Sequence, residues 1–482
     1  MAVTPPPPGR FHIAFDSTTL DHTPAWTRID NHPNLVTRYQ IDRGRQYELD
    51  RTDSGRATVE IADKDGLLDP TNPSSPYYPN KIQPMKQAML CRKNPVDGTW
   101  YTRYRGFIDE WDYSFDPSQR VNRLTVSLSD LYEVFSQTQF IPGAFGDEPP
   151  IEVLEAYGDQ VFYYNARVDY RIGQLICDAF ELTPPPPTPP YTWPAKVHAF
   201  AVIFSGNVEV RGQIYSPGES VMTAIQEAAD AEFPGVANVY VDSHGRLVFH
   251  GRLAKFDPTG VASGTTDDRW DYHQFRAGDG AAAESDPPMA RIRAFGFNRG
   301  ASKIINQAQA LPAKTYIASP AGGGTDPTTD EVRGQLYEDA TSKGLYGIRS
   351  WTVQDLQTRN GFLGDPETSS RTGSLEETKK FAKYYVDNFR DPNNRVAEIQ
   401  FKSIRPGEPG ATETWRLLSK ADISDRITVT IDSPGGGGFD HVPYFIEGIH
   451  ETCSPLNPDM DYVEMTLDLS PQALFTYNPW AP

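Results

Sequence analysis

Cysteine is scarce in this sequence. The 482 residues include three cysteines, Cys91, Cys177 and Cys453, which are odd in number, far apart and not spaced as CxxC. This spacing predicts neither a disulfide framework nor a zinc site. We therefore expect the chain to fold in a reducing cytoplasm.

Long apolar runs are also missing. No apolar run approaches the roughly 18 to 20 residues that span a bilayer. The opening MAVTPPPPGRF lacks the basic-then-apolar order of a signal peptide. Neither membrane insertion nor secretion is expected.

Positive charge is in deficit. Lysine and arginine number 45 against 64 aspartates and glutamates, which gives a net charge of -19. Affinity for a nucleic-acid backbone comes from cations that displace counterions, so tight nucleic-acid binding is not expected. A surface that DNA passes without binding tightly would fit this excess of negative charge.

The residues that are abundant favour strands and turns. Aromatic residues make up 12% of the chain, which also has 42 prolines and 38 glycines. Tyr, Trp and Phe suit pleated, half-buried surfaces, whereas frequent Pro and Gly favour turns and limit long helices. The length predicts about three domains of roughly 150 residues each. We predict a β-rich α+β protein with two tube-like β-barrel or sandwich domains and a smaller α/β domain between them.

The N-terminal part, residues 1–140, is predicted to be the first β-barrel. RLTVSL at residues 123–128 alternates apolar and polar side chains, the period-2 pattern of a strand with one wet face. YTRYRGFIDEWDYSF at residues 101–115 predicts a second strand, with Gly106 as the expected bulge, and the two should form a hairpin. A short helix is expected from Ser129.

Residues 141–288 have the pattern of a mixed α/β domain with a Pro-rich linker. Asp169 is the expected cap of one helix, which ends before the TPPPPTPP segment of residues 183–190. A second helix is expected to have Ser216 as its cap and Pro217 in its first turn. VANVYVDSHGRLVFH, residues 236–250, predicts a β-hairpin after it.

The third part, residues 289–482, is predicted to be a second β-barrel with a loop-rich insert at about residues 312–373. A helix capped by Ser374, with Glu377 completing a capping box, leads into the barrel. Strands are then expected at residues 425–431, 444–450 and 462–470, the last with clear alternation.

One candidate ion site is the stretch ADKDGLLDPTN, in which Asp63, Asp65 and Asp69 surround Gly66. An EF-hand loop that begins at Asp63 needs a ligand at position 5, Gly at position 6 and Glu at position 12. The sequence has leucines at positions 5 and 6 and no Glu at 12, so the calcium pattern fails, although a looser site made of the three aspartates stays open. A turn is favoured, in which the aspartates accept backbone N–H bonds and Gly66 has a positive φ.

Asp109, Glu110 and Asp112 are the other acidic candidates, as the acid and base of a glycosidase. Adjacent strand residues point to opposite faces, so Asp109 and Glu110 can share a cleft only across a bulge. A solvated sheet face is the favoured interpretation.

Other catalytic patterns are missing from the sequence. The nine histidines show no metal-ligand spacing, and no serine lies in a GxSxG motif. The glycine runs at residues 322–324 and 435–438 lack the following Lys and Ser or Thr of a phosphate loop. We predict no catalytic, cofactor-binding or metal-binding residue, and no enzymatic activity.

An ordered set of motifs resembles the minor tail proteins of siphophages, especially those of actinobacterial hosts. An R-x-x-S/T-G-x-A-x-V strand, a D-x-x-G-x-x-D-P-x-N turn, an L-K or M-K strand and an R-G-x-I-x-x-W strand occur at residues 51–59, 63–72, 84–90 and 105–111. Residues 220–252 are similar to the helix-then-hairpin module of baseplate and tail hub proteins, and residues 417–431 with 444–452 to their closing barrel. The Pro-rich insert at residues 183–190 and the Gly-rich loop near Gly323 depart from the pattern.

The resemblance implies a tail hub at the tip of a virion, assembled in the host cytoplasm. Such a hub is a homotrimeric ring that continues the tail tube, forms a channel for DNA ejection, and adjoins distal tail, tape measure and tip or fibre proteins. A distal tail protein in a six-fold ring is the alternative within the structural class. A tail-tip cell-wall hydrolase using Glu110 or Asp109, and a glycan-binding adhesin using Tyr191 or Trp193, are alternatives from other classes.

Overall fold

The computed structural model describes most of the chain, and the statements below concern that part. The described residues are 5–31, 35–116, 121–143, 145–147, 160–256, 273–279, 288–298, 300–312, 336–357, 371–392, 395–432, 438–457 and 460–475.

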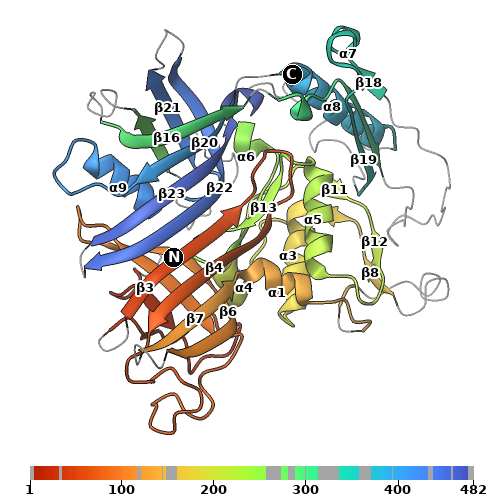
Figure 1. The fold of residues 1–482 in the computed structure, drawn as a ribbon. Helices are drawn as coiled ribbons and strands as arrows, with labels where there is room; N and C mark the ends of the chain where they lie inside the picture. The colour runs from red at the N-terminus through yellow and green to blue at the C-terminus, as the bar shows by residue number, and fades with distance from the viewer. Residues whose placement is uncertain are drawn as a thin grey trace.

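One large sheet dominates the molecule (Figure 1). Its thirteen strands follow the order β2-β1-β5-β6-β7-β4-β3-β22-β21-β15-β16-β20-β23. The first half comes from the N-terminal region: β1 (Phe11–Ile13), β2 (Thr27–Arg28), β3 (Leu35–Gly44), β4 (Asp53–Ala62), β5 (Gln87–Lys93), β6 (Trp100–Asp116) and β7 (Val121–Ser129). The second half follows much later: β15 (Gln274–Gly278), β16 (Ala290–Asn298), β20 (Arg395–Lys402), β21 (Arg426–Asp432), β22 (Gly438–Asn457) and β23 (Met460–Pro471).

Strand β22 joins the two halves. One edge of β22 pairs first with β21, from Gly438 to Phe445, and then with β3, from Gly448 to Cys453. The other edge pairs with β23, which closes the C-terminal strands into a six-stranded barrel. A strand of 20 residues is long enough to belong to the barrel and to extend the N-terminal sheet.

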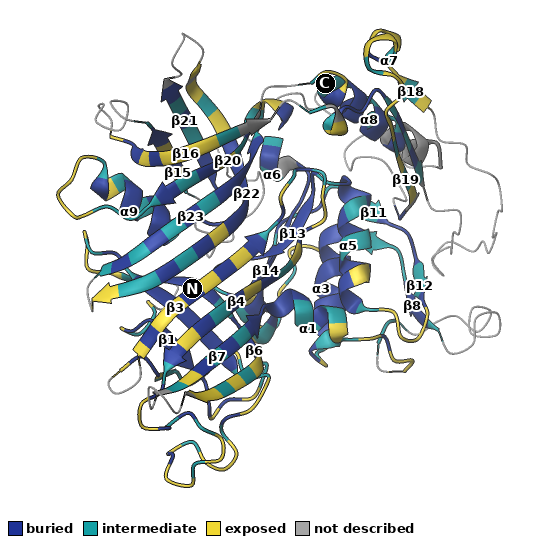
Figure 2. Cartoon of the chain, viewed as in Figure 1, coloured by how far each residue is buried: buried dark blue, intermediate teal, exposed yellow. Residues whose placement is uncertain are grey.

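A single hydrophobic core lies under both halves of the sheet. Val59 and Val126 of the first half belong to the same buried cluster as Ile399, Ile449 and Leu467 of the second. Along β3, β4 and β23, buried side chains alternate with more exposed ones, which is visible as alternating colours in Figure 2. Because cross-strand partners share a face, these strands bury one face and leave the other more exposed.

A smaller α/β unit packs beside the sheet around a second core. Its helices are α1 (Leu131–Gln137), α3 (Val168–Ala179), α4 (Ala195–Phe200), α5 (Val221–Glu232) and α6 (Leu253–Phe256). Its strands are β8 (Val161–Tyr163), β9 (Ala166–Arg167), β10 (Ala201–Ile203), β11 (Glu209–Val210), β12 (Gln213–Tyr215), β13 (Asn238–Val241) and β14 (Leu247–His250).

A third group of elements lies outside the large sheet. Strands β17 (Gln307–Pro312), β18 (Leu336–Glu338) and β19 (Ser350–Leu356) form a sheet in the order β18-β17-β19, against which α8 (Arg371–Phe389) packs. The remaining helices are α7 (Ala340–Tyr346), α9 (Ala411–Lys420) and the 3-10 turns Ala301–Lys303 and Gln472–Phe475. Figure 1 shows α7 and β18 at the end of the molecule farthest from β3 and β7.

Most predicted elements are confirmed. The hairpins β6–β7 and β13–β14, the short helix α1 and the strands β21, β22 and β23 occur where the sequence pattern predicts them. The β-rich α+β class is also confirmed. Two separate barrel domains are not confirmed, because the N-terminal and C-terminal halves of the large sheet share one sheet and one core. The domain limits at residues 140 and 288 stay predictions.

Four helix starts differ from the predictions, and α1 begins at Leu131 with Asp130 as its cap, not at Ser129. Helix α5 begins at Val221 with Ser220 as its cap, not Ser216. Contacts with a distant segment explain this difference. Gln139 forms a β-bridge with Ser220, and the Val221 N–H donates a hydrogen bond to the Thr138 carbonyl. These contacts hold the residues just before Val221 in an extended conformation. Helix α3 begins one residue before Asp169, and α8 begins at Arg371, before Ser374.

The bulge in β6 also differs from the prediction. The register with β7 shifts between Ile108 and Glu110, so Asp109 and not Gly106 lies at the bulge. Before the shift, Phe107 faces the core of the α/β unit and Ile108 the core of the large sheet, whereas the shift places Glu110 opposite Ser127, on the other face from Ile108. Gly106 is required for a different reason, since a Cβ there would lie 2.2 Å from the Ser129 carbonyl oxygen.

Candidate functional site

A row of polar side chains crosses the junction of the two halves. The row is built from direct cross-strand partners on β6, β7, β4, β3, β22, β23 and β20: Glu110, Ser127, Thr58, Gln40, Thr452, Glu464 and Lys402. All seven side chains are exposed or half-buried. We call this set the polar row. It makes the wet face of the sheet continuous from the N-terminal strands to the C-terminal barrel.

His450 sits on the same face, where β3 meets the barrel. Its Nδ1 and Nε2 each lie 2.9 Å from a carboxylate oxygen, of Asp42 on β3 and Asp468 on β23 respectively. The two hydrogen bonds raise the pKa of His450 to about 10, although burial alone would lower it. A protonated His450 therefore links three strands, next to a polar cavity of about 260 Å³.

Below this face, buried ion pairs connect the halves. Glu451 of β22 pairs with Arg92 of β5 and with Arg103 of β6, the latter at 3.3 Å. Arg103 Nη1 also donates to the carbonyls of Ser419 and Ala421 at the end of α9, at 3.1 and 3.0 Å. Guanidinium groups suit the unpaired carbonyls at a helix C-terminus, so strands of the N-terminal half hold a helix of the C-terminal half.

Glu447 marks the irregular point in β22 where its partner changes from β21 to β3. It accepts a hydrogen bond from Arg45 Nε at 2.8 Å and another from Lys255 Nζ. Burial raises the pKa of Glu447, but the two cations outweigh this effect and hold it at about 2. Gly44 faces this bulge with φ +93°, and a Cβ there would lie 2.2 Å from the Glu447 carbonyl oxygen.

The candidate ion site ADKDGLLDPTN is a turn. The buried carboxylate of Asp63 accepts hydrogen bonds from the backbone N–H groups of Leu67 and Leu68, both at 2.9 Å. Asp69 accepts from Thr71, and Gly66 has φ +66°. The turn interpretation is therefore confirmed. Within the described residues no group of His, Cys, Asp or Glu side chains could hold a metal ion.

The candidate acids on β6 lie at its bulge and just beyond it. Asp109, at the bulge, accepts a hydrogen bond from Ser129 Oγ at 2.7 Å, and burial raises its pKa. Glu110 belongs to the polar row opposite Ser127, and Asp112 lies opposite Thr125. Both Asp109 and Glu110 are exposed, on the open surface of a strand.

Tyr191 and Trp193, the candidate glycan contacts, pack against α3. Their rings form a trio with Tyr170, with centroids 5.2 to 5.9 Å apart. Trp193 covers Gly173 so closely that a Cβ there would lie 2.1 Å from its ring. Tyr170 also bonds to the carbonyl of Pro185. The Pro-rich segment therefore contacts α3 through Tyr170.

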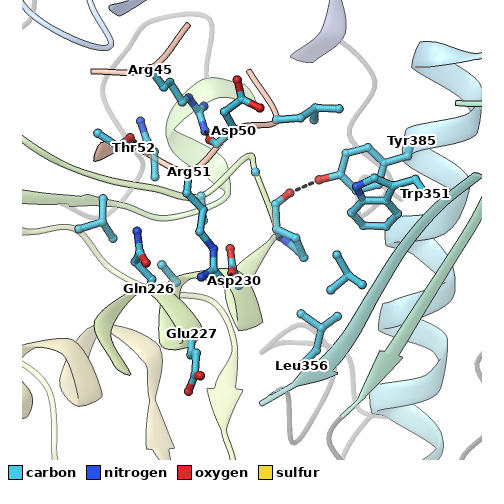
Figure 3. Close-up of a pocket in the computed structure, with 18 of the residues that line it drawn as sticks. Arg45, Asp50, Arg51, Thr52, Gln226, Glu227, Asp230, Trp351, Leu356 and Tyr385 are labelled. Carbon is cyan, nitrogen blue, oxygen red and sulfur yellow. Dashed lines mark hydrogen bonds and ion pairs between the residues drawn. The ribbon is translucent and has the colours of Figure 1, made fainter. Parts of the chain in front are cut away.

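A cavity of about 360 Å³ lies where the three groups of elements meet (Figure 3). It is lined by the segment after β3, by α5 and β13, and by β19 with α8. Figure 3 shows Arg45, Thr52 and Arg51 on one side and Trp351 with Tyr385 on the other. We call it the junction cavity. No local sequence motif indicates it, since its residues come from positions 45 to 385.

The junction cavity combines charged and aromatic walls. Arg51 pairs with Asp230 at 2.6 Å. Glu227 accepts from Gln357 Nε2 at 2.6 Å, and burial raises its pKa to about 6. The rings of Trp351 and Tyr385 lie 3.9 Å apart between centroids. The polar wall therefore carries the carboxylates of Asp50, Glu227 and Asp230 beside the cations Arg45 and Arg51, and the opposite wall carries the two rings.

Comparisons with known proteins give structural neighbours. No family model and no curated protein matches the chain. The tail protein of Neisseria meningitidis MC58 is 12% identical, with a TM-score of 0.49, over 97% of this chain and 98% of that one. The 43 kDa tail protein of prophage MuSo2 from Shewanella oneidensis is 11% identical, with a TM-score of 0.47, over 97% and 99%.

A third neighbour comes from a secretion system. It is an E. coli component of the type VI secretion system, described as structurally similar to T4 bacteriophage tail proteins. It is 10% identical, with a TM-score of 0.40, over 91% of this chain and 74% of that one. The neighbours are of the phage tail type. In the described part of the chain, no helix is long and apolar enough to cross a membrane.

Proposed function

We propose that this chain is a structural, non-enzymatic component of a phage tail, the hub at the tail tip. Three copies would form a ring that continues the tail tube and anchors tip or fibre proteins. The observation that carries the proposal is the polar row, because it makes one wet face out of strands from both ends of the chain. The motifs at residues 51–59, 63–72 and 105–111, typical of siphophage minor tail proteins, lie on this same part of the sheet or next to it.

A wall around a channel needs such a sheet. One face must be wetted, the other must pack on a core, and the whole must resist bending when neighbouring copies press on it. In this chain the buried pairs of Glu451 with Arg92 and Arg103 fasten the two halves beneath the wet face. A closed ring then requires each copy to present two different complementary surfaces.

The charges on this face suit a channel for DNA. This face carries carboxylates such as Glu110 and Glu464 and cations such as Lys402 and Arg293, and Arg293 is paired with Glu464. The chain as a whole carries a net charge of -19. This excess of negative charge disfavours tight binding of the passing DNA. We therefore propose that the polar row faces the channel through which DNA is ejected.

The ring symmetry distinguishes the hub from a distal tail protein. Electron cryomicroscopy of intact particles, with this chain located by a bound Fab fragment, measures it directly. Three copies around the tail axis support the hub, whereas six copies indicate the distal ring. A position away from the tail would overturn both.

A charge change tests the role of the polar row. Particles are assembled with Gln40→Lys and Ser127→Lys, which add two cations per copy to the wet face. The control adds two lysines on the distant helix α7, at the exposed Thr341 and at Gly344, where a Cβ meets no atom. We expect normal tails and DNA ejection several-fold slower than in the control. Equal ejection rates would show that this face does not line the channel.

A further inference from the structure

The junction cavity lies along the free edge of strand β19. Five of its lining residues are Trp351, Thr352, Val353, Gln354 and Leu356, all from β19. Successive side chains of a strand point to opposite faces. A cavity lined by both sets must therefore lie beside the strand, where the backbone hydrogen-bonding groups point.

The register with β17 shows which backbone groups face the cavity. The Arg349 carbonyl accepts from Gln307 N–H at 3.2 Å, and the parallel pairing continues from there. Alternate residues of a parallel strand bond to the same neighbour, so Trp351 and Val353 bond to β17. The N–H and C=O groups of Thr352 and Gln354 point the other way. No strand in the described part of the chain pairs with this edge.

Two residues of the polar wall have a buried nitrogen without a partner among the described residues. Arg45 uses Nε for Glu447 and Nη1 for the Asp50 carbonyl, both at 2.8 Å, which leaves Nη2 without a partner. Asn238 Oδ1 accepts a hydrogen bond from Thr52 Oγ1 at 2.9 Å. This bond fixes the orientation of the amide group and leaves Nδ2 without a partner among the described residues. Arg45 and Asn238 are 6% and 3% exposed. Buried donors of this kind call for an acceptor.

The opposite wall carries aromatic and aliphatic side chains. Trp351 lies over Tyr385, whose hydroxyl bonds to the Pro234 carbonyl, and Leu356 is buried beside them. An extended peptide places alternate side chains on opposite sides. One set would therefore lie toward Arg45 and Asn238, whose unpartnered nitrogens become accessible when these side chains shift, while the other covers the Trp351 ring.

We propose that the junction cavity binds an extended peptide segment of another protein, added as a strand to the edge of β19. The segment carries an acceptor side chain, Asp or Asn, that reaches Arg45 and Asn238, between apolar side chains that pack on Trp351. Strand addition uses backbone hydrogen bonds for affinity and side-chain pockets for specificity. This inference rests on the cavity and the strand edge and does not depend on the proposed ring.

Peptide binding to the full chain tests the proposal. The probes are fluorescein-labelled peptides of sequence Thr-Val-X-Val-Thr with blocked ends, in which X is Asp, Asn, Leu or Lys, and fluorescence polarisation gives the Kd. We expect the Asp and Asn peptides to bind at least tenfold more tightly than the Leu and Lys peptides. Asn238→Ala should remove most of this preference. Failure of all four peptides to bind at millimolar concentration would overturn the proposal.

A proline substitution tests the strand edge. Thr352→Pro removes a backbone N–H that faces the cavity and leaves the bonds to β17, whereas Thr352→Ala keeps the N–H. We expect the Asp peptide to bind at least tenfold more weakly to Thr352→Pro and normally to Thr352→Ala, with urea unfolding showing that both variants are folded. Equal binding to both would refute strand addition.

Two further outcomes would assign the cavity to another occupant. If acetyl-aspartate amide alone competes as well as the Asp peptide, the cavity is a small-molecule site. If Thr352→Pro dissociates an oligomer of this chain, and the Asp peptide does the same, the occupant is a second copy. Either result would overturn the proposal, whereas the ring symmetry in particles would be measured independently.

Discussion

Replacing Glu451 by glutamine should destabilise the fold strongly, because the glutamate is the shared partner of two buried cations. The side chains of Glu451, Arg92 and Arg103 are 0%, 0% and 1% exposed. Removing one partner of a buried ion pair leaves an uncompensated charge and costs about 3 to 5 kcal/mol. Glutamine keeps the shape and some hydrogen bonding, so we expect a loss of about 3 kcal/mol in the free energy of unfolding.

The matched control is Glu464→Gln on the neighbouring strand. Glu464 pairs with Arg293, but the two side chains are 44% and 51% exposed. An ion pair of this exposure contributes about 0.2 to 1 kcal/mol. Urea unfolding of wild type and both variants, followed by tryptophan fluorescence, gives the comparison at equal m-values. If Glu451→Gln costs no more than Glu464→Gln, the buried pairs do not hold the two halves together.

Three other changes test the junction and the turn. The His450 pKa is raised to about 10, so its contribution is complete below its unfolded value near 6.5 and is lost as pH rises through 10. Because the side chain is 49% exposed, His450→Gln should cost about 1 kcal/mol at pH 6 and little at pH 10.5, measured by urea unfolding; a loss independent of pH would contradict a protonated His450 bonded to Asp42 and Asp468. Gly44→Ala should cost about 2 kcal/mol or more, since φ is +93° and the methyl group meets Glu447; an unchanged urea midpoint would contradict this. Asp63→Ala should cost about 1 to 2 kcal/mol by freeing two backbone N–H groups, whereas Asp65→Ala, at an exposed position, should cost little.

Features set by residues close together in the chain are predictable from the sequence, whereas features set by distant residues are not. The alternation in residues 123–128 and 462–470 predicted strands β7 and β23, because burial of one face repeats every second residue. The turn at Asp63 was also predictable, since its carboxylate bonds to N–H groups only four and five residues away. In contrast, the start of α5 was predicted four residues early, because a bridge from Gln139 to Ser220 competes with the local cap.

Local patterns in the sequence are enough to predict the β-rich class, the hairpins, the Asp63 turn and the order of the tail-type motifs. The pairing of β3 with β22, the positions that form the polar row and the place of the junction cavity emerge only in the folded chain. The physical reason is that a periodic pattern specifies the face of a strand but not its partner. Asp42 and His450 are 408 residues apart, and Arg45 and Glu447 are 402 apart. Their contacts exist because packing of the shared core brings the two ends of the chain together.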